Sequence, residues 1–274
     1  ITVVDRSSLF KRQQVAGRVT IQRDFYAPRE LRQVSVNDAY FLEKQMSKVE
    51  GESKTVLDRV RRGTWPLVPA DRDVLCAFAA LQNLRTEARR GQLVKELSTR
   101  IITPGSRLSL GARKKASIAN RPDGRDQWRV WKYGPETLVA TDSWMHVRHI
   151  QDIFPAAWAS ISAAKLTLYR FSEPCLWTSD NPVVGRGWTR RAWWGEAIEV
   201  EVSMPVGRDM LLVGRLDPGL SEEEEMATAA GERDGEADGD RQLAEATNGL
   251  LWAHSTRSMF MHPDDEITAS VGDG

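Results

Sequence analysis

The stretch PADRDVLCAFAALQNLRT, residues 69–86, decides how the N-terminal half of the chain folds. Pro69 suits the first turn of a helix, where its missing N–H is not needed, and Asp71 favours the positive end of the helix dipole. Apolar side chains then recur at helical spacing, namely Val74, Leu75, Phe78, Ala79 and Leu81. The pattern predicts a helix that runs from Pro69 to about residues 90–91.

Helical patterns also flank this stretch on both sides. Residues 35–63 carry apolar side chains near helical spacing, with a cap near residues 35–37, and Gly51 is a point where the run can divide into two helices. A further helical region is expected over residues 136–164, where Pro155 makes a kink or a fresh start.

In the C-terminal half the apolar pattern changes to a period of two. Residues 166–171 and 175–178 predict a hairpin. Residues 198–202 and 210–213 predict a second strand pair, joined by a turn near Gly207.

The remaining C-terminal elements complete the predicted fold. Ser221 and Glu224 form the S-x-x-E pattern of a capping box, which begins a helix. A late helix is expected over about residues 241–254 and a last strand over about residues 257–262. The predicted fold class is therefore α+β, with a helical N-terminal half packed with a C-terminal antiparallel sheet.

We expect the whole chain, residues 1–274, to form a single domain. Its parts in chain order are an N-terminal extended segment (1–34), a mainly helical part (35–165) and an antiparallel sheet with a late helix (166–274). Nine acidic side chains and one basic side chain, with interspersed glycines, lie between Glu222 and Asp240. This composition predicts a mobile acidic loop near residues 226–240.

The composition excludes several classes of protein. The 274 residues hold 38 basic and 38 acidic side chains, so the overall charge attracts neither nucleic acid nor a membrane surface. No apolar run approaches the ~18 residues that a membrane-spanning helix needs. The two cysteines, Cys76 and Cys175, are too few for a disulfide framework or a multi-cysteine zinc site. We expect a cytoplasmic protein.

The first group of candidate site residues lies on the helix that begins at Pro69. Gln82, Arg85 or Thr86, and Arg89 fall on one stripe of that helix, beside its apolar face. A half-buried guanidinium needs an acceptor, which is either a carboxylate of the protein or a bound anion. Arg85 therefore belongs to a structural ion pair or holds an anionic ligand.

The second group follows a predicted strand. Ser179, Asp180 and Asn181 form a polar run before Pro182, a pattern that is typical of a tight turn. Such a turn places a hydroxyl, a carboxylate and an amide at the end of a sheet, where functional sites are often built. The turn by itself is an equally good explanation of these residues.

Three other patterns carry weaker hypotheses. Asp142, His146 and His149 share one helix face, which is either a polar surface or part of a divalent-metal site. The basic stretch 107–129 contacts single-stranded nucleic acid, forms a solvated face or pairs with the acidic segment. Arg257 to His262 has the R-x4-H spacing of HEPN-type ribonucleases, but it is discounted because it falls on a predicted strand and arises readily by chance.

Three segments together resemble a bacterial family called domain of unknown function 4238. They are Val49-Glu50-Gly51, Leu81-Gln82-Asn83-Leu84-Arg85-Thr86 and Thr178-Ser179-Asp180-Asn181-Pro182-Val183. Asn248 also stands where that family tends to carry an asparagine. The resemblance covers about residues 20–262, and residues 1–34 lack the His-Tyr-Val-Pro-like motif with which family members usually begin. The resemblance implies a single domain and brings no established activity.

Two functions fit these residues. The first is a hydrolase for an anionic phosphoester or nucleic-acid substrate, with Arg85 as anion holder and Glu50 or Asp180 as general base or metal ligand. Its other expected site residues are Asn181 in catalysis and, for substrate binding, Gln82, Thr86, Ser179, His149 and Asn248. The alternative is a non-catalytic module that binds a small anionic ligand or a protein partner. A divalent metal is a possible cofactor of the first.

Overall fold

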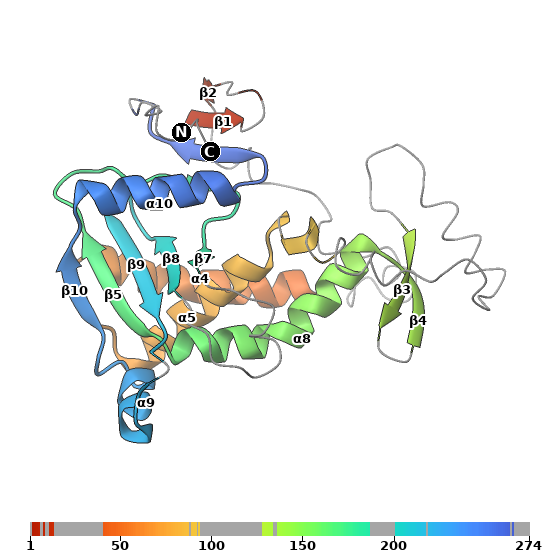
Figure 1. The fold of residues 1–274 in the computed structure, drawn as a ribbon, viewed down its shortest axis with the longest axis horizontal. Helices are drawn as coiled ribbons and strands as arrows, with labels where there is room; N and C mark the ends of the chain where they lie inside the picture. The colour runs from red at the N-terminus through yellow and green to blue at the C-terminus, as the bar shows by residue number, and fades with distance from the viewer. Residues whose placement is uncertain are drawn as a thin grey trace. The chain divides into compact units, whose positions relative to one another are not determined.

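The computed structural model describes residues 2–5, 8, 11–13, 41–87, 89–91, 93, 128–133, 136–186, 201–217, 219–263 and 265 (Figure 1). The chain divides into two compact units. Unit 1 comprises Ile1–Ile21, Val49–Thr86 and Phe154–Gly274, and unit 2 comprises Gln22–Lys48 and Glu87–Ile153. That all 274 residues form one domain stays a prediction.

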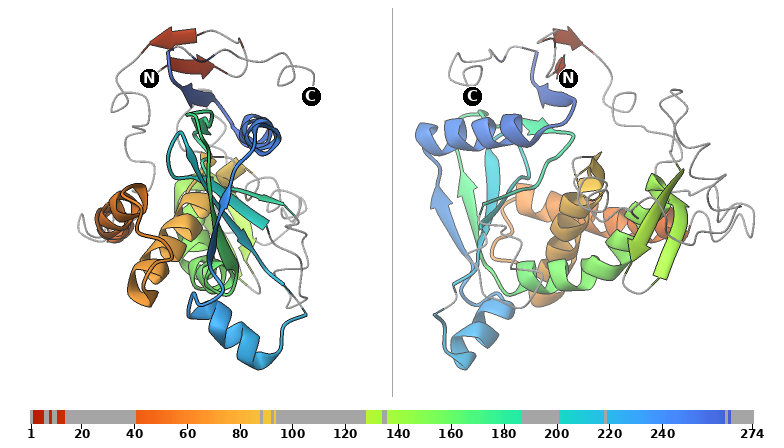
Figure 2. Two further views of the ribbon diagram at one scale, coloured as in Figure 1. Left: turned by 90° about the vertical axis from the view of Figure 1, so that its left-hand side faces the viewer. Right: turned by 45° about the vertical axis from the view of Figure 1, so that its right-hand side comes forward.

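Unit 1 contains a five-stranded sheet with the strand order β10-β5-β9-β8-β7. The strands are β5 (Lys165–Arg170), β7 (Val184–Arg186), β8 (Glu201–Pro205), β9 (Met210–Arg215) and β10 (Gly235–Asp238). Neighbours run antiparallel except β10 and β5, which pair in parallel. The predicted pairing of the strands on either side of Gly207 is confirmed as β8–β9. The fold class is α+β, as predicted (Figure 2).

A second, four-stranded sheet has the order β2-β1-β11-β6. Its strands are β1 (Thr2–Asp5), β2 (Lys11–Gln13), β6 (Thr178–Ser179) and β11 (Ser258–Met261). The predicted hairpin of residues 166–171 with 175–178 is therefore wrong, because β5 pairs with β9 and β10 while β6 pairs with β11. The physical reason lies in the turn that joins β8 to β9. The carbonyl oxygen of Arg208 accepts the N–H groups of Cys175 and Leu176 at 2.9 and 2.8 Å, which prevents residues 175–176 from folding back on β5.

The helix that begins at Pro69 is present but shorter than predicted. Helix α5 (Pro69–Leu84) ends at Leu84, where the N–H of Arg85 donates to the carbonyl oxygen of Leu81. Residues 85–86 interrupt the helical backbone before it resumes at residue 87. Arg85 therefore stands at the end of a helix instead of within one.

The two flanking helices also differ from their predictions. Helix α4 (Phe41–Arg61) continues without a break through Gly51. Helix α8 (Asp142–Ser162) contains Pro155, but residues 136–141 are strand β4 (Glu136–Thr141), paired with β3 (Trp128–Tyr133) in a two-stranded sheet. The alternation of Thr137, Val139 and Thr141, all β-branched, favours this strand.

The acidic segment forms regular structure over much of its length, contrary to the loop expected near residues 226–240. Helix α9 (Glu222–Ala229) begins with the predicted capping box, in which Ser221 and Glu224 bond each other's backbone N–H groups. Strand β10 follows, and Asp234 just before it is buried in an ion pair with Arg72. This buried pair and the pairing of β10 with β5 hold the segment against the rest of unit 1.

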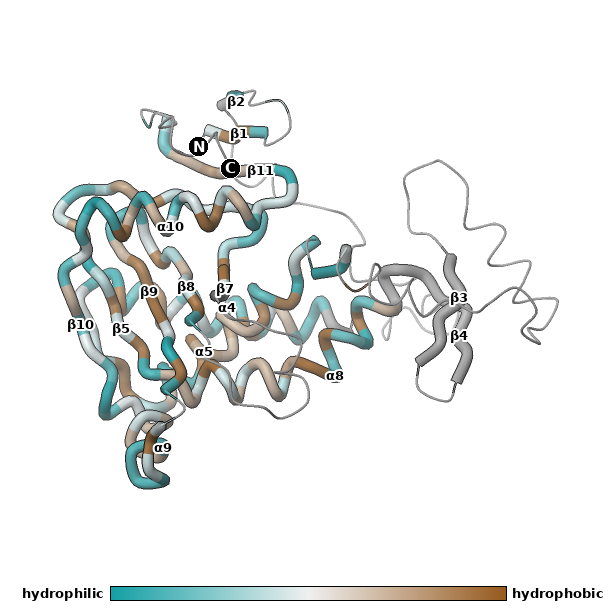
Figure 3. Tube along the Cα trace, viewed as in Figure 1, coloured by the Kyte–Doolittle hydropathy of each residue, from teal (hydrophilic) through white to brown (hydrophobic). Residues whose placement is uncertain are grey.

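The last elements lie where the sequence predicts them. Helix α10 (Arg241–His254) begins at Asp240, whose side chain accepts the N–H of Leu243 at 2.7 Å. Ala244 on this helix packs in one core cluster with Phe171, Leu211 and Val213. Figure 3 shows the hydrophobic residues of β9 inside the sheet, in contrast to the hydrophilic start of α9. None of the described helices is long and apolar enough to cross a membrane.

A buried arginine is the main polar element of the core of unit 1. Arg72 on α5 is 1 % exposed. Its guanidinium donates to both carboxylate oxygens of Asp234, at 2.7 and 3.3 Å, and to the carbonyl oxygens of Ser162, Ala164 and Ala229. Asp234 also accepts the N–H of Leu166 at 2.9 Å. These bonds join α5 to the end of α8, to β5 and to the segment between α9 and β10.

Candidate functional site

An ion pair joins the first two motif segments. Arg85 at the end of α5 donates through Nη1 to Oε1 of Glu50 on α4. The two side chains remain 29 % and 40 % exposed. Of the two acceptors expected for Arg85, a carboxylate or a bound anion, the structure contains the carboxylate of Glu50, in a position that solvent reaches.

A hydrogen bond joins the second and third motif segments. Nδ2 of Asn83 on α5 donates to the carbonyl oxygen of Val183 at 3.3 Å, and Asn83 is buried. Gln82 and Thr86, the predicted substrate-binding residues beside it, are buried as well. Contacts therefore link the three segments in pairs, through Arg85 to Glu50 and through Asn83 to Val183.

The polar run after β6 is bonded to nearby backbone. The hydroxyl of Ser179 accepts the N–H of Asn181 at 3.0 Å and donates to its carbonyl oxygen at 2.8 Å. The two carboxylate oxygens of Asp180 accept the N–H groups of Thr256 and Arg257 at 3.0 and 2.7 Å. These bonds shape the turn between α10 and β11. A catalytic role of Asp180 and Asn181 stays a prediction.

The side chain of Asn248 bonds the backbone of the segment before β6. From α10, its side-chain oxygen accepts the N–H of Trp177 at 3.0 Å, and its side-chain nitrogen donates to the carbonyl oxygen of Cys175 at 2.9 Å. The side-chain amide of Asn248 thus satisfies two backbone groups of residues 175–177 that a neighbouring strand would otherwise bond. This is a structural reason for the asparagine, and its predicted role in substrate binding stays a prediction.

The predicted histidine face lies at the start of α8. His146 is fully buried and His149 is half-buried, while the side chain of Asp142 lies outside the described part of the structure. Burial, together with the nearby charge of Arg89, lowers the pKa of His149, and Asp152 opposes this shift. Among the described residues, no group of three or more His, Cys, Asp or Glu side chains is placed to hold a metal ion.

The nucleic-acid hypothesis concerns a stretch that falls largely outside the described residues. Of the basic stretch 107–129, only Trp128 and Arg129 are described, as backbone at the start of β3. A nucleic-acid contact by this stretch therefore stays a prediction.

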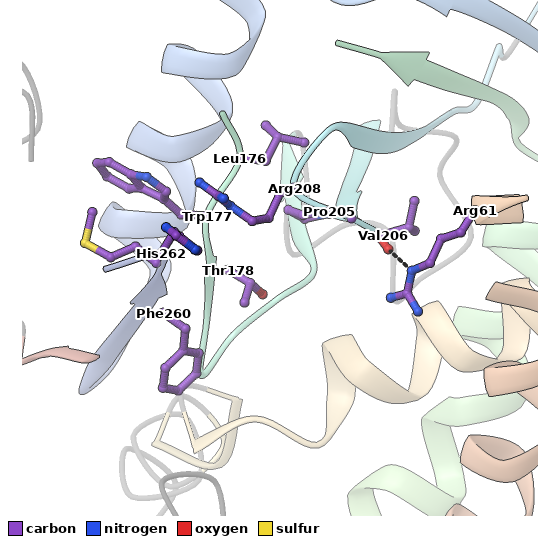
Figure 4. Close-up of a pocket in the computed structure, with 11 residues that line it drawn as sticks. Arg61, Leu176, Trp177, Thr178, Pro205, Val206, Arg208, Phe260 and His262 are labelled. Carbon is purple, nitrogen blue, oxygen red and sulfur yellow. Dashed lines mark hydrogen bonds between the residues drawn. The ribbon is translucent and has the colours of Figure 1, made fainter. Parts of the chain in front are cut away.

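Unit 1 contains a pocket of about 450 Å³ (Figure 4). It lies where the end of α4, the segment before β6, the β8–β9 turn and the end of β11 meet. Its apolar lining is formed by Leu176, Trp177, Pro205, Val206, Phe260 and Met261. The other lining residues are Arg61, Thr178, Gly207, Arg208 and His262.

The two arginines contact different parts of the pocket. Figure 4 shows Arg208 near Trp177 and His262, and Arg61 on the other side of Val206. Nε of Arg61 donates to the carbonyl oxygen of Val206 at 3.1 Å, and its Nη1 lies 3.3 Å from a carboxylate oxygen of Asp58. The guanidinium of Arg61 is thereby fixed at the rim while part of it stays open to solvent.

Arg208 carries an unsatisfied donor. Its Nη2 lies 2.5 Å from Oδ1 of Asp265, whose other oxygen accepts the N–H of His262 at 2.9 Å. Its Nε is buried and has no hydrogen-bond partner among the residues that the structure describes. A buried guanidinium N–H without an acceptor is unfavourable, and the rest of the side chain, which lines the pocket and leaves Arg208 39 % exposed, is where an incoming anion would make contact.

A comparison with protein families decides where the chain belongs. The model of the family described as Protein of unknown function (DUF4238) matches residues 1–265. The chain belongs to this family. The match confirms the resemblance carried by the three motif segments, and it includes the N-terminal residues that lack the His-Tyr-Val-Pro-like motif. No curated protein and no solved structure matches the chain.

Sequence reasoning missed the pocket of this DUF4238 protein. The only signals near it were the discounted R-x4-H spacing, whose His262 lines the pocket, and Thr178, which begins the third motif segment. Arg61 and Arg208 stand in no recognisable motif. They reach the pocket because α4 ends beside the β8–β9 turn, a contact between residues 145 positions apart in the sequence.

Proposed function

We propose that this DUF4238 protein binds a small anionic organic ligand in the pocket that Arg61 and Arg208 line. The observation that carries the proposal is the side chain of Arg208, which lines the pocket, stays 39 % exposed and pairs with one carboxylate among the described residues. A ligand carboxylate or phosphate oxygen would accept N–H groups from the exposed part of this guanidinium and interact with its charge. The described carboxylates that pair with the two arginines, Asp58 and Asp265, are not among the lining residues.

The size of the pocket is consistent with a small ligand. Pockets for small molecules commonly measure about 300–1,000 Å³ and combine an apolar wall with a few polar groups. The pocket of about 450 Å³ has this composition. The proposal corresponds to the binding-module alternative, with a small anionic ligand as the partner.

Isothermal titration with a panel of small organic anions tests the proposal. We expect at least one anion to bind the wild-type protein, and Arg208→Gln to weaken that binding about tenfold or more, since a charge-assisted hydrogen bond is lost. Arg215→Gln is the matched control, because Arg215 pairs with Glu201 outside the pocket. Equal binding by wild type and Arg208→Gln would contradict the proposal.

Hydrolysis of an anionic phosphoester is the second candidate. Its support is the Glu50–Arg85 pair, which joins a possible general base to an anion holder at a solvent-accessible position. A phosphoester screen with and without Mg²⁺ tests it. Turnover that Glu50→Gln abolishes and Glu52→Gln retains would favour this candidate, since Glu52 is exposed on the same helix. Turnover that Glu50→Gln leaves unchanged would exclude Glu50 as the base.

We also propose a cytoplasmic location in a bacterium. The support is that both cysteines are free thiols, as expected in a reducing compartment, and that the resemblance is to a bacterial family. Fractionation of the native host with an antibody against the protein would test the location. Recovery with the extracellular or periplasmic fraction would contradict it.

A further inference from the structure

The chemical character of the pocket narrows the ligand that it accepts, and this inference rests on the proposed function. Six of the lining residues are apolar, including Trp177 and Phe260 with their aromatic rings and Pro205 and Val206 of the β8–β9 connection. A ligand without apolar surface leaves this wall in contact with water. A ligand with a ring or an alkyl chain gains free energy by covering it.

The net positive charge around the pocket is smaller than its two arginines indicate. Arg61 is paired with Asp58 at 3.3 Å, and Arg208 with Asp265 at 2.5 Å. Two guanidinium charges are therefore balanced by two carboxylate charges within ion-pair distance. His262 is the remaining lining residue that can carry positive charge among those described.

This balance favours a ligand with one negative charge. A single carboxylate can bond the exposed part of the Arg208 guanidinium, whose Nη2 already donates to Asp265. A dianionic phosphate brings a second charge that Asp58 and Asp265 repel, because like charges disfavour each other. The arginines then orient the anionic group of the ligand more than they add net electrostatic attraction for it.

We infer that the pocket binds an organic monoanion with an apolar body, of the class of aryl- or alkyl-substituted carboxylic acids. The carboxylate bonds the exposed part of the Arg208 guanidinium. The apolar body lies against the wall that Phe260, Pro205 and Val206 provide.

Isothermal titration of the full chain near pH 7.5 with four probes tests the inference. The probes are phenylpropionate, propionate, phenylpropanol and phenylpropyl phosphate, which separate the contributions of the ring, the single charge and the second charge. We expect phenylpropionate to bind about tenfold tighter than propionate or phenylpropanol and about threefold tighter than the phosphate ester. Tighter binding of the phosphate ester, or of propionate, overturns the inference.

A variant of the paired carboxylate gives an independent readout. Asp265→Asn keeps an oxygen that accepts the N–H of His262 but removes the charge beside Arg208. We expect this variant to shift the preference toward phenylpropyl phosphate by about tenfold, whereas the matched Glu201→Gln, paired with Arg215 outside the pocket, leaves the preference unchanged. An unchanged preference in Asp265→Asn overturns the argument from charge balance.

The failure of the inference and the failure of the proposed function give different results. If the phosphate ester binds best and Arg208→Gln abolishes its binding, the pocket is an anion site and the inference about a monoanion is wrong. If Arg208→Gln has no effect on any probe, the proposed function itself is wrong.

Discussion

Arg72 and Arg208 differ in how completely the protein satisfies the hydrogen bonds of the guanidinium group. Arg72 is 1 % exposed, and its guanidinium donates to Asp234 and to the carbonyl oxygens of Ser162, Ala164 and Ala229. The side chain of Arg208 is 39 % exposed, bonds one carboxylate and keeps a buried Nε without a partner among the described residues. The first arginine is saturated by the protein, and the second retains capacity for a ligand.

The difference shows how to separate a structural charge from a functional one. A buried charge whose hydrogen bonds are complete stabilises one arrangement of helices and strands and offers nothing to a ligand. A charge that lines a pocket and stays partly exposed contributes less to the fold and more to binding. Substitutions in the two regions should therefore affect different quantities.

The largest expected effect is that of Arg72→Met. The substitution leaves the carboxylate of Asp234, which is 0 % exposed, without its partner, and a broken buried pair typically costs about 3–5 kcal/mol. Urea unfolding measures the loss. Should Arg72→Met fail to fold, Arg72→Lys serves instead, since it keeps the charge but loses the bidentate contact. A loss below about 1 kcal/mol in both variants would contradict the role of Arg72 in the core.

A smaller loss is expected from Gly231→Ala, at the end of α9. Gly231 has a φ of +82°, and a Cβ there would lie 2.7 Å from Cδ of Arg72, whose side chain is fixed by its bonds. Together the strain and the close contact should cost about 2 kcal/mol. Gly235→Ala is the control, because a Cβ at Gly235 meets no atom within 4 Å. Thermal unfolding compares the two, and equal melting temperatures would count against a rigid Arg72.

The next prediction compares two carboxylates that the sequence assigns to catalysis. Asp180→Ala removes the acceptors of the Thr256 and Arg257 N–H groups and should cost about 1–2 kcal/mol in urea unfolding. Glu50→Ala breaks a partly exposed ion pair and should cost less than about 1 kcal/mol. If Asp180→Ala is as stable as the wild type, its bonds to the turn are not structural, and its candidacy for catalysis is strengthened.

The smallest expected effect is on the reactivity of the two cysteines. Cys76 lies near Arg72, and Cys175 lies near Arg208. Cys76 touches Arg72, and burial raises the pKa of its thiol to about 11; burial also raises the pKa of the half-exposed Cys175. Since the thiolate is the reactive form, Cys175 should be labelled slowly by iodoacetamide in the native protein and Cys76 only after unfolding. Raising the pH toward 9 should accelerate labelling of Cys175. Native labelling that persists in Cys175→Ser would show that Cys76 is accessible.

Local signals allowed part of the fold to be predicted. Pro69 and Asp71 identified the start of α5, and the Ser221–Glu224 capping box identified the start of α9, because each signal acts within one helical turn. The hairpin prediction was wrong because β5 pairs with β9, some forty residues further on, and nothing in residues 166–178 carries that information.

The candidate site was harder to predict from the sequence than the fold was. Glu50 and Arg85 were assigned to one site in the hypothesis, as base or metal ligand and as anion holder, and the structure joins them in an ion pair, 35 residues apart. Asp234, the partner of Arg72, lies 162 residues away in a segment whose composition predicted a loop. The pocket combines Arg61 with short runs of residues from three distant segments, so no spacing in the sequence marks it.

The most direct test of the contrast between the two arginines is the thermal unfolding of Arg208→Gln with and without phenylpropionate. Without ligand, we expect its melting temperature to stay within a few degrees of the wild-type value, unlike that of Arg72→Met. With ligand at about 100 times its Kd, the wild type should gain about 2.7 kcal/mol of stability, and Arg208→Gln should gain little. A variant that is as unstable as Arg72→Met, or that is stabilised by the ligand as strongly as the wild type, would contradict the account.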